Sequence, residues 1–237
     1  AHLLDIPDMG IFHVRYENGA TTVENVMNSN QKASVFADLG FRASDLLQSN
    51  CIIWVEGPTD RIYLNHWISA CDPQLIDGIH YSIMFYGGRL LSHLTADDPE
   101  VSGFISLRRL NRYISIVIDS DKANPEDDVN DTKKRIKEEF DEGPGHSWIT
   151  HGREIENYVE PTILTRAIKA TYPQAAELNE INPYTHMYWY KNHEGEVMQN
   201  ADKIKIARKV AEEKPFLEIL DLKEQIAKLI NFIHKAN

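Results

Sequence analysis

Six acidic residues follow three predicted strands of the sequence in pairs, and acids placed in this way could bind divalent cations. The segments at 51–55 and 113–118 are rich in Ile and other apolar residues, as is typical of strands buried in a parallel sheet, and the segment at 146–150 is expected to be a further strand. The carboxyl ends of parallel strands meet at one edge of a sheet, where ligands bind. We therefore expect these acids to converge at that edge. They are Glu56, Asp60, Asp119, Asp121, Glu154 and Glu156.

The three pairs are informative only when they are considered jointly. Asp60 by itself could be an acid that favours the N-terminal dipole of a helix, and Glu154 could form a surface pair with Arg153. The Asp-Ser-Asp segment at 119–121, whose aspartates would share a side if strand alternation continued, also resembles segments in phosphatases, glycosyltransferases and ordinary loops. Clustered carboxylates would raise one another's pKa, and two divalent ions would offset that repulsion. The joint pattern predicts a site for two Mg²⁺ or Mn²⁺ ions.

The elements that must position these acids alternate between strands and helices. Helices are expected over residues 59–70, around residues 90–94 and after Asp128, and Gly57 is expected to allow the tight turn before the first of them. This alternation predicts an α/β fold of the Rossmann-like type, with a mostly parallel sheet and right-handed crossovers. The predicted strands cover residues 51–55, 81–86, 113–118 and 146–150.

The pattern becomes helical after residue 160. Pro161 suits the first position of one helix, a second begins near Asn200, and a last amphipathic helix carries Leu222, Ile226 and Ile233. Residues 173–200 are expected to be irregular. The predicted regions are a β-hairpin over 1–30, a helical linker over 31–50, the α/β core over 51–160 and a helical annex over 161–237.

Composition narrows the classes of protein that the chain can belong to. Its 237 residues contain 42% apolar residues and carry a formal charge of −11, the wrong sign for simple electrostatic binding to DNA. No apolar run is long enough to span a membrane, and no signal peptide is recognisable, so we expect a cytoplasmic protein. Cys51 is expected to be a buried thiol. A disulfide between Cys51 and Cys71, the other cysteine, remains the alternative.

Three motifs together resemble a known family. Val-Glu-Gly-Pro-Thr-Asp at 55–60, Asp-Ser-Asp at 119–121 and Arg-Glu-Ile-Glu-Asn-Tyr at 153–158 are similar to the C-terminal TOPRIM domain of OLD-family (overcoming lysogenization defect) ATP-dependent endonucleases. The first two motifs are shared with topoisomerases and bacterial primases, whereas the third is more particular to the OLD-like branch. The resemblance implies a metal-dependent DNA endonuclease with a TOPRIM core, in which the six acids hold two Mg²⁺ or Mn²⁺ ions.

The resemblance also implies a catalytic lysine and an upstream ATPase domain. Lys203 matches a functional lysine of the C-terminal region, Lys205 is its close rival, and either could be a solvated helix lysine. The segment at 2–14 resembles the tail of an ABC-type ATPase domain. Since the chain lacks a Walker A motif, ATP hydrolysis would lie in that upstream domain, which could also form a homo-oligomer. A role in anti-phage defence follows from the resemblance alone.

Several alternatives remain open at this level. The chain could be a non-hydrolytic metal-binding module that regulates an ATPase, another phosphotransfer enzyme such as a phosphatase, or a nuclease that acts on RNA. A topoisomerase would need a tyrosine nucleophile, but the tyrosines near the motifs are expected to be packing residues. A plain turn at 87–89, a spacer role for Ser120 and a core or interface role for the aromatic segment 184–190 are also expected. Those tyrosines are Tyr63, Tyr113 and Tyr158.

Overall fold

The computed structural model of the chain describes residues 12–17, 20–25, 50–86, 113–143, 145–178, 182–199 and 201–237. Three expectations therefore fall outside the described residues. They are the helical linker over 31–50, apart from Asn50, the turn at 87–89 and a short helix expected near 90–94.

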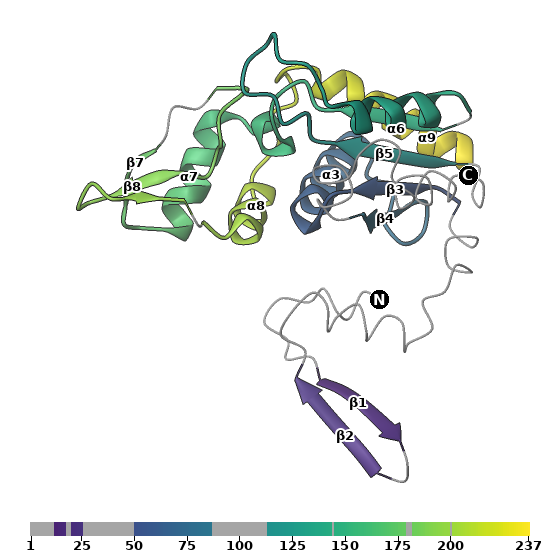
Figure 1. Cartoon of the computed structure of the whole chain (residues 1–237), viewed down its shortest axis with the longest axis horizontal. Coiled ribbons are helices and arrows are strands. Elements are labelled where there is room, and N and C mark those ends of the chain that lie inside the picture. Colours follow the sequence, from purple (N-terminus) through teal and green to yellow (C-terminus); the bar gives the residue numbers. More distant parts are fainter. Residues whose placement is uncertain are drawn as a thin grey trace. The chain divides into compact units, whose positions relative to one another are not determined.

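The chain forms two compact units, Ala1–Gln48 and Ser49–Asn237. In the first unit, β1 (Phe12–Glu17) and β2 (Ala20–Asn25) pair antiparallel, which confirms the expected hairpin (Figure 1). Its assignment to an upstream domain stays a prediction. The second unit contains both the predicted α/β core and the predicted annex.

A four-stranded parallel sheet forms the centre of the second unit. Each strand pairs with its neighbours in parallel register, in the order β4-β3-β5-β6. All five residues of β5, the third strand along the chain, are buried, which explains why that segment is apolar apart from Ser115. The mixed α/β fold with a parallel sheet is as the sequence predicts. The strands are β3 (Ile52–Val55), β4 (Ser82–Phe85), β5 (Ile114–Ile118) and β6 (His146–Ile149).

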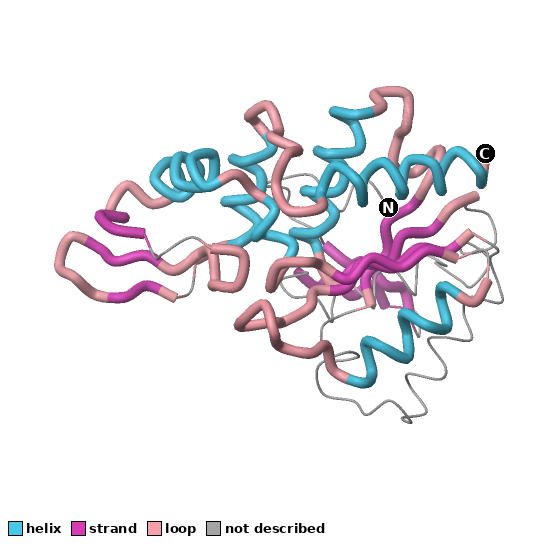
Figure 2. Tube along the Cα trace, turned by 90° about the horizontal axis from the view of Figure 1, so that it is seen from above, coloured by secondary structure: helices cyan, strands magenta, loops and turns pink. Residues whose placement is uncertain are grey.

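Helices lie on both faces of this sheet, as Figure 2 shows. The helices α3 (Pro58–Cys71) and α9 (Leu222–Ala236) contact each other and share one buried cluster with Val117 of β5 and Trp148 of β6. The helix α6 (Asp131–Asp141) contacts β5 and β6 but stays outside that cluster, although its apolar side chains are buried. Alternate residues of the strands therefore pack against different helices.

The annex contains the expected helices and a small sheet that the sequence did not predict. Helix α7 (Pro161–Thr171) begins at the predicted proline and contacts α8 (Lys203–Ala211). The stretch of sequence between these two helices forms a three-stranded antiparallel sheet in the order β7-β8-β9, where irregular chain was expected. Its strands are short and largely exposed, so they carry no alternating pattern. They are β7 (Ala175–Leu178), β8 (Tyr190–Asn192) and β9 (Val197–Met198).

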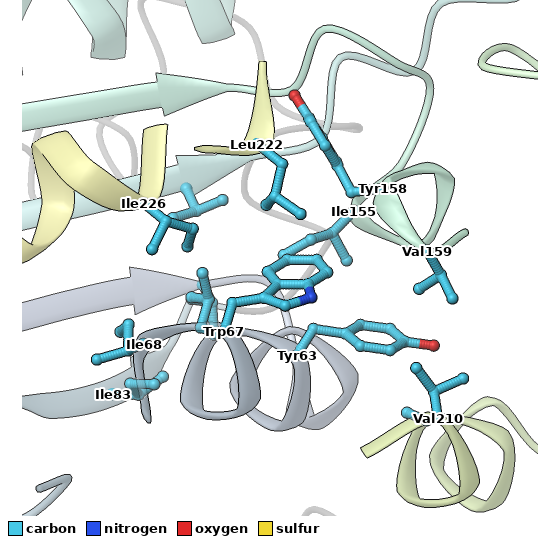
Figure 3. Close-up of a cluster of buried hydrophobic side chains, with 14 of the residues drawn as sticks. Tyr63, Trp67, Ile68, Ile83, Ile155, Tyr158, Val159, Val210, Leu222 and Ile226 are labelled. Carbon is cyan, nitrogen blue, oxygen red and sulfur yellow. The ribbon is translucent and has the colours of Figure 1, made fainter. Parts of the chain in front are cut away.

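Aromatic side chains join the core and the annex into one hydrophobic cluster (Figure 3). Tyr63 stacks on Trp67 with 5.4 Å between ring centroids, and Trp67 meets the edge of Tyr158 at 6.3 Å. Leu222 of α9 and Val210 of α8 lie against the same group. The burial of Tyr63 and Tyr158 confirms that these tyrosines are packing residues.

Two further expectations concern the cysteines and membranes. Cys51 is buried, Cys71 is exposed, and both are free thiols. Within the described residues, no helix has the length and apolar character needed to cross a bilayer.

Candidate metal centre

The six acids occupy the carboxyl ends of three neighbouring strands. Glu56 directly follows β3, and Asp60 lies in the first turn of α3. Asp119 directly follows β5, and the last pair lies where the chain leaves β6 and enters the 3₁₀ helix η2 (Ile155–Tyr158). Since β3, β5 and β6 are adjacent in the sheet, these positions share one edge. Charges from Asp60, Glu156, Glu56 and Glu154 all act on Asp119, so the structure brings these acids together.

Three of the acids form a buried inner group, namely Asp60, Asp119 and Glu156. Asp60 and Glu156 are buried and Asp119 is half-buried. Burial, and then the charge of Glu156, raise the pKa of Asp60 to about 8. Burial, followed by the charges of Asp60 and Glu156, raises the pKa of Asp119 well above its usual value, and burial also raises the pKa of Glu156. These carboxyl groups therefore favour a bound proton or a nearby cation over a bare negative charge.

Glu56 and Asp121 form a more exposed outer pair. The side chain of Asp121 is 53% exposed, and Glu56 is also exposed. Partial desolvation, and then the charge of Asp121, raise the pKa of Glu56, which indicates that the two carboxylates are close. The outer pair could receive a ligand from solvent, whereas the inner group faces the protein.

The Asp119–Asp121 turn does not continue the strand, contrary to the expected alternation. Asp121 has a φ of 59°, in the left-handed region that aspartate tolerates better than most residues. Asp119 Oδ1 accepts a hydrogen bond of 2.8 Å from the amide of Ile155, whereas the carboxylate of Asp121 pairs with Lys133. The two aspartates therefore have different partners although they belong to one motif.

Ser120 fixes this turn to the chain that follows β6. Its hydroxyl donates to the carbonyl of Gly152 at 2.6 Å, and its amide donates to Oγ1 of Thr150 at 2.8 Å. Ser120 is buried, so it acts as the expected spacer and also as an anchor. The amide of Asp121 adds a hydrogen bond of 2.9 Å to the carbonyl of Arg153.

The Glu154–Glu156 segment is held by its own set of contacts. The amide of Glu154 donates to Oδ1 of Asn157 at 2.8 Å, and the side-chain amide of Asn157 donates to the carbonyls of Asn182 and Thr185, each at 3.0 Å. A Cβ atom at Gly152 would lie 2.8 Å from the carbonyl oxygen of Pro183, so this position requires glycine. Asn157 is thus a structural member of the third motif.

Gly57 does not have the role that the sequence suggests. Its φ of −161° is extended backbone that any residue can adopt, and a Cβ atom there would meet nothing within 4 Å. Its contribution is a backbone amide that donates to Oδ2 of Asp60 at 2.6 Å. Pro58 occupies the first turn of α3, where its missing amide proton leaves no hydrogen bond unmade.

Lys203 reaches the acids, and Lys205 does not. The Nζ atom of Lys203 lies 3.1 Å from Glu154 Oε2 and 3.4 Å from Glu156 Oε1, and 5.4 Å from the ring centroid of Tyr188. Burial opposes its charge, but Glu156 and Glu154 outweigh that effect and raise the pKa of the amine. The side chain of Lys205 is 68% exposed and pairs with Asp202 at 3.6 Å.

Sequence reasoning missed Lys133. Its side chain is only 3% exposed, its Nζ atom donates to the carbonyl oxygen of Asp119 at 2.8 Å, and it forms an ion pair with Asp121. A signal for its burial was available, because Lys133 precedes Ile136 and Phe140 by three and seven residues, the spacing of one helix face.

Two other residues near the acids were not anticipated. His186 lies with Nδ1 3.0 Å from Glu154 Oε1, and its ring stacks on Trp189 with 5.0 Å between centroids. Tyr86 directly follows β4 and donates to the carbonyl of Val117 at 3.1 Å. Burial, and then the charge of Asp119, raise the pKa of Tyr86. Tyr188, from the aromatic segment, is buried in the core.

The donor set fits a hard divalent cation. It consists of carboxylate oxygens, which suit Mg²⁺ and Mn²⁺, and it contains no thiol. As placed in the described residues, no three Asp, Glu, His or Cys side chains form a preassembled ligand group. The raised pKa values of the inner group nevertheless indicate that a cation there would relieve repulsion.

Comparison with protein-family models, with curated proteins and with solved structures found no match to this chain. The resemblance to the OLD-family TOPRIM domain is therefore carried by the three acidic motifs.

Proposed function

We propose that this chain is a metal-dependent DNA endonuclease of the TOPRIM type and forms the nuclease part of an OLD-like ATPase–nuclease. The observation that carries the proposal is the meeting of acids from three adjacent strand ends at one edge of a parallel sheet. Topologically distant carboxylates that raise one another's pKa indicate a site organised around positive charge. The resemblance of the three motifs to the OLD-family TOPRIM domain implies that two divalent ions supply that charge.

The acidic residues would have different positions around the metal ions of such a site. Bound divalent ions would lower the pKa of an attacking water and stabilise the leaving oxygen. Asp60, Asp119 and Glu156 would hold these ions from the protein side, and Glu56, Asp121 and Glu154 would complete the ligand set.

Lys203 supplies a cation that a substrate can reach. Its side chain is 48% exposed while its amine lies beside Glu154 and Glu156. Hydrogen bonds from this ammonium to a non-bridging phosphate oxygen would stabilise the charge of the transition state. The side chain of the rival Lys205 pairs with Asp202 and is largely exposed to solvent.

The acidity of the chain is compatible with a DNA substrate under this mechanism. A formal charge of −11 repels phosphate, but divalent ions at the acid cluster reverse the local sign. Cleavage is therefore expected to depend on the metal for binding as well as for chemistry.

Cleavage of supercoiled plasmid DNA tests the proposal. Wild-type protein should convert the plasmid to nicked or linear forms with Mn²⁺ or Mg²⁺, and chelation should stop the reaction. Asp119→Asn and Glu56→Gln should each lower the rate by about 100-fold or more, because each removes a carboxylate proposed to bind metal. Glu138→Gln, on the exposed face of α6, is the matched control and should leave the rate unchanged.

The outcome separates the rival functions. Metal binding without cleavage of DNA by the wild-type protein would favour a regulatory module. Turnover of p-nitrophenyl phosphate without cleavage of DNA would favour a phosphatase. Cleavage that survives both acid substitutions would show that the nuclease activity resides elsewhere or in a contaminant.

A further inference from the structure

Lys133 has an unusual environment for a lysine. Its side chain is 3% exposed, and it lies on the buried face of α6 next to Ile136 and Phe140. A buried ammonium group is strongly unfavourable unless it is paired and hydrogen-bonded. Here the ion pair with Asp121 and the hydrogen bond to the carbonyl of Asp119 meet that requirement.

Both partners of Lys133 belong to the same turn of the candidate metal centre. The ammonium group contacts the backbone carbonyl of Asp119 and the carboxylate of Asp121, so it connects the two ends of the Asp119–Asp121 turn. The left-handed backbone at Asp121 needs support from its surroundings. Ser120 provides a second support for the turn, because its hydroxyl donates a hydrogen bond to the carbonyl of Gly152.

The burial of Lys133 excludes direct contact with a substrate. The adjacent Lys134 differs in this respect, because its side chain is 40% exposed and pairs with Asp128 outside the acid cluster. The two lysines share a helix, a charge and nearly the same sequence position. Only Lys133 can influence the metal centre through its contacts.

We infer that Lys133 is a positioning residue, which holds the Asp119–Asp121 turn so that Asp119 faces the inner acids while Asp121 stays beside Glu56. This inference rests on the proposed metal-dependent function. It differs from a purely electrostatic role, in which Lys133 only neutralises Asp121. Loss of charge alone would strengthen cation binding, whereas loss of position would weaken it.

Titration calorimetry with Mn²⁺ at fixed pH distinguishes the two roles without measuring catalysis. Lys133→Met should raise the Kd for Mn²⁺ by about 10-fold to 100-fold, the usual effect of losing a partner of a metal ligand. Ser120→Ala alters no charge and removes only the hydroxyl contact of the turn with the carbonyl of Gly152, so it should raise the Kd by a smaller factor. Lys134→Met is the matched control and should bind Mn²⁺ as the wild-type protein does.

Each outcome of these titrations supports or overturns the inference. An unchanged or lower Kd in Lys133→Met would overturn it and leave the nuclease proposal intact, provided that the wild-type protein binds Mn²⁺ and cleaves DNA. If circular dichroism shows that Lys133→Met does not fold, Lys133→Arg decides, because it keeps the positive charge but changes the geometry of the contacts, and an unchanged Kd there overturns the inference. A wild-type protein that neither binds Mn²⁺ nor cleaves DNA would remove both proposals.

Discussion

Each of two acid pairs has its own lysine, and the two lysines differ in their access to solvent. Lys133 contacts the Asp119–Asp121 turn with a side chain that is 3% exposed, whereas Lys203 contacts Glu154 and Glu156 with one that is 48% exposed. The buried lysine can act only on the protein. The accessible lysine can also meet a phosphate. Exposure, more than charge, therefore separates the positioning role proposed for Lys133 from the catalytic role proposed for Lys203.

The surroundings of the two lysines differ in the same way. Lys133 lies on α6 and contacts a turn that is also held by buried hydrogen bonds of Ser120 to Thr150 and Gly152. Lys203 begins a helix, and its amine contacts carboxylates and the face of Tyr188. The contacts of Lys133 and Ser120 thus include backbone carbonyls, whereas the contacts of the Lys203 amine are with side chains.

The largest effect expected on the accessible side comes from Lys203→Met. We expect the rate of DNA cleavage to fall by about 100-fold to 1000-fold, as for the loss of a single donor to transition-state charge. Lys205→Met is the matched control and should cost little, since its amine pairs with Asp202. Plasmid cleavage under single-turnover conditions measures both. A greater loss in the Lys205 variant would reverse the assignment of the two lysines.

An intermediate effect is expected from pH, through the carboxyl group of Asp60. Its pKa of about 8 lies above the ordinary value of 3.8, so protonation favours the folded state. This contribution is complete below about pH 4 and is lost as the pH rises through about 8. Mg²⁺ must displace such protons, so its affinity should rise by up to about tenfold per pH unit for each proton released.

Thermal unfolding at pH 6 and pH 8, with and without Mg²⁺, measures this linkage. The rise in Tm caused by Mg²⁺ should be larger at pH 8 in the wild-type protein. Asp60→Asn should weaken the pH dependence, because it removes one of the carboxyl groups with a raised pKa. A Mg²⁺ effect that is equal at both pH values in the wild-type protein would contradict the raised pKa.

The smallest effect is expected from the aromatic ring beneath Lys203. Tyr188→Leu removes the ring face, and a cation–π contact contributes about 0.5–2 kcal/mol, equivalent to about twofold to thirtyfold in rate. Tyr188→Phe keeps the ring and loses only the 2.7 Å hydrogen bond to the hydroxyl of Tyr63. We expect its cleavage rate to stay near the wild-type value. Equal losses in both variants would assign the effect to that hydroxyl pair instead.

The core of the fold could be predicted because each of its strands and helices is indicated by a pattern within a short stretch of sequence. The buried strand β5 is apolar apart from Ser115, and Asp119 and Asp121 follow it within three residues. Parallel strands then bring separate motifs to one edge without further information. The sheet β7-β8-β9 escaped prediction because its strands are two to four residues long and largely exposed.

The details of the candidate site depend on tertiary contacts, which local patterns do not contain. The left-handed conformation of Asp121 depends on how α6 and the chain after β6 meet the turn. The spacing of Lys133 with Ile136 and Phe140 indicates a buried face, but its partner appears only when the helix is docked. Lys203 and Lys205 cannot be ranked by sequence, since both begin the same helix and only the fold brings one to the acids.

The hydrogen bonds between the second and third motifs have a consequence for the chain that connects them. The amide of Asp121 donates to Arg153, and the amide of Ile155 donates to Asp119, so two distant stretches form one interlocked unit. The largely exposed segment at 123–128 lies outside this unit. Insertions there would lengthen a surface loop at small entropic cost while the spacing of the acids stayed the same. The segment is therefore a suitable place to attach a reporter or a tether beside the site.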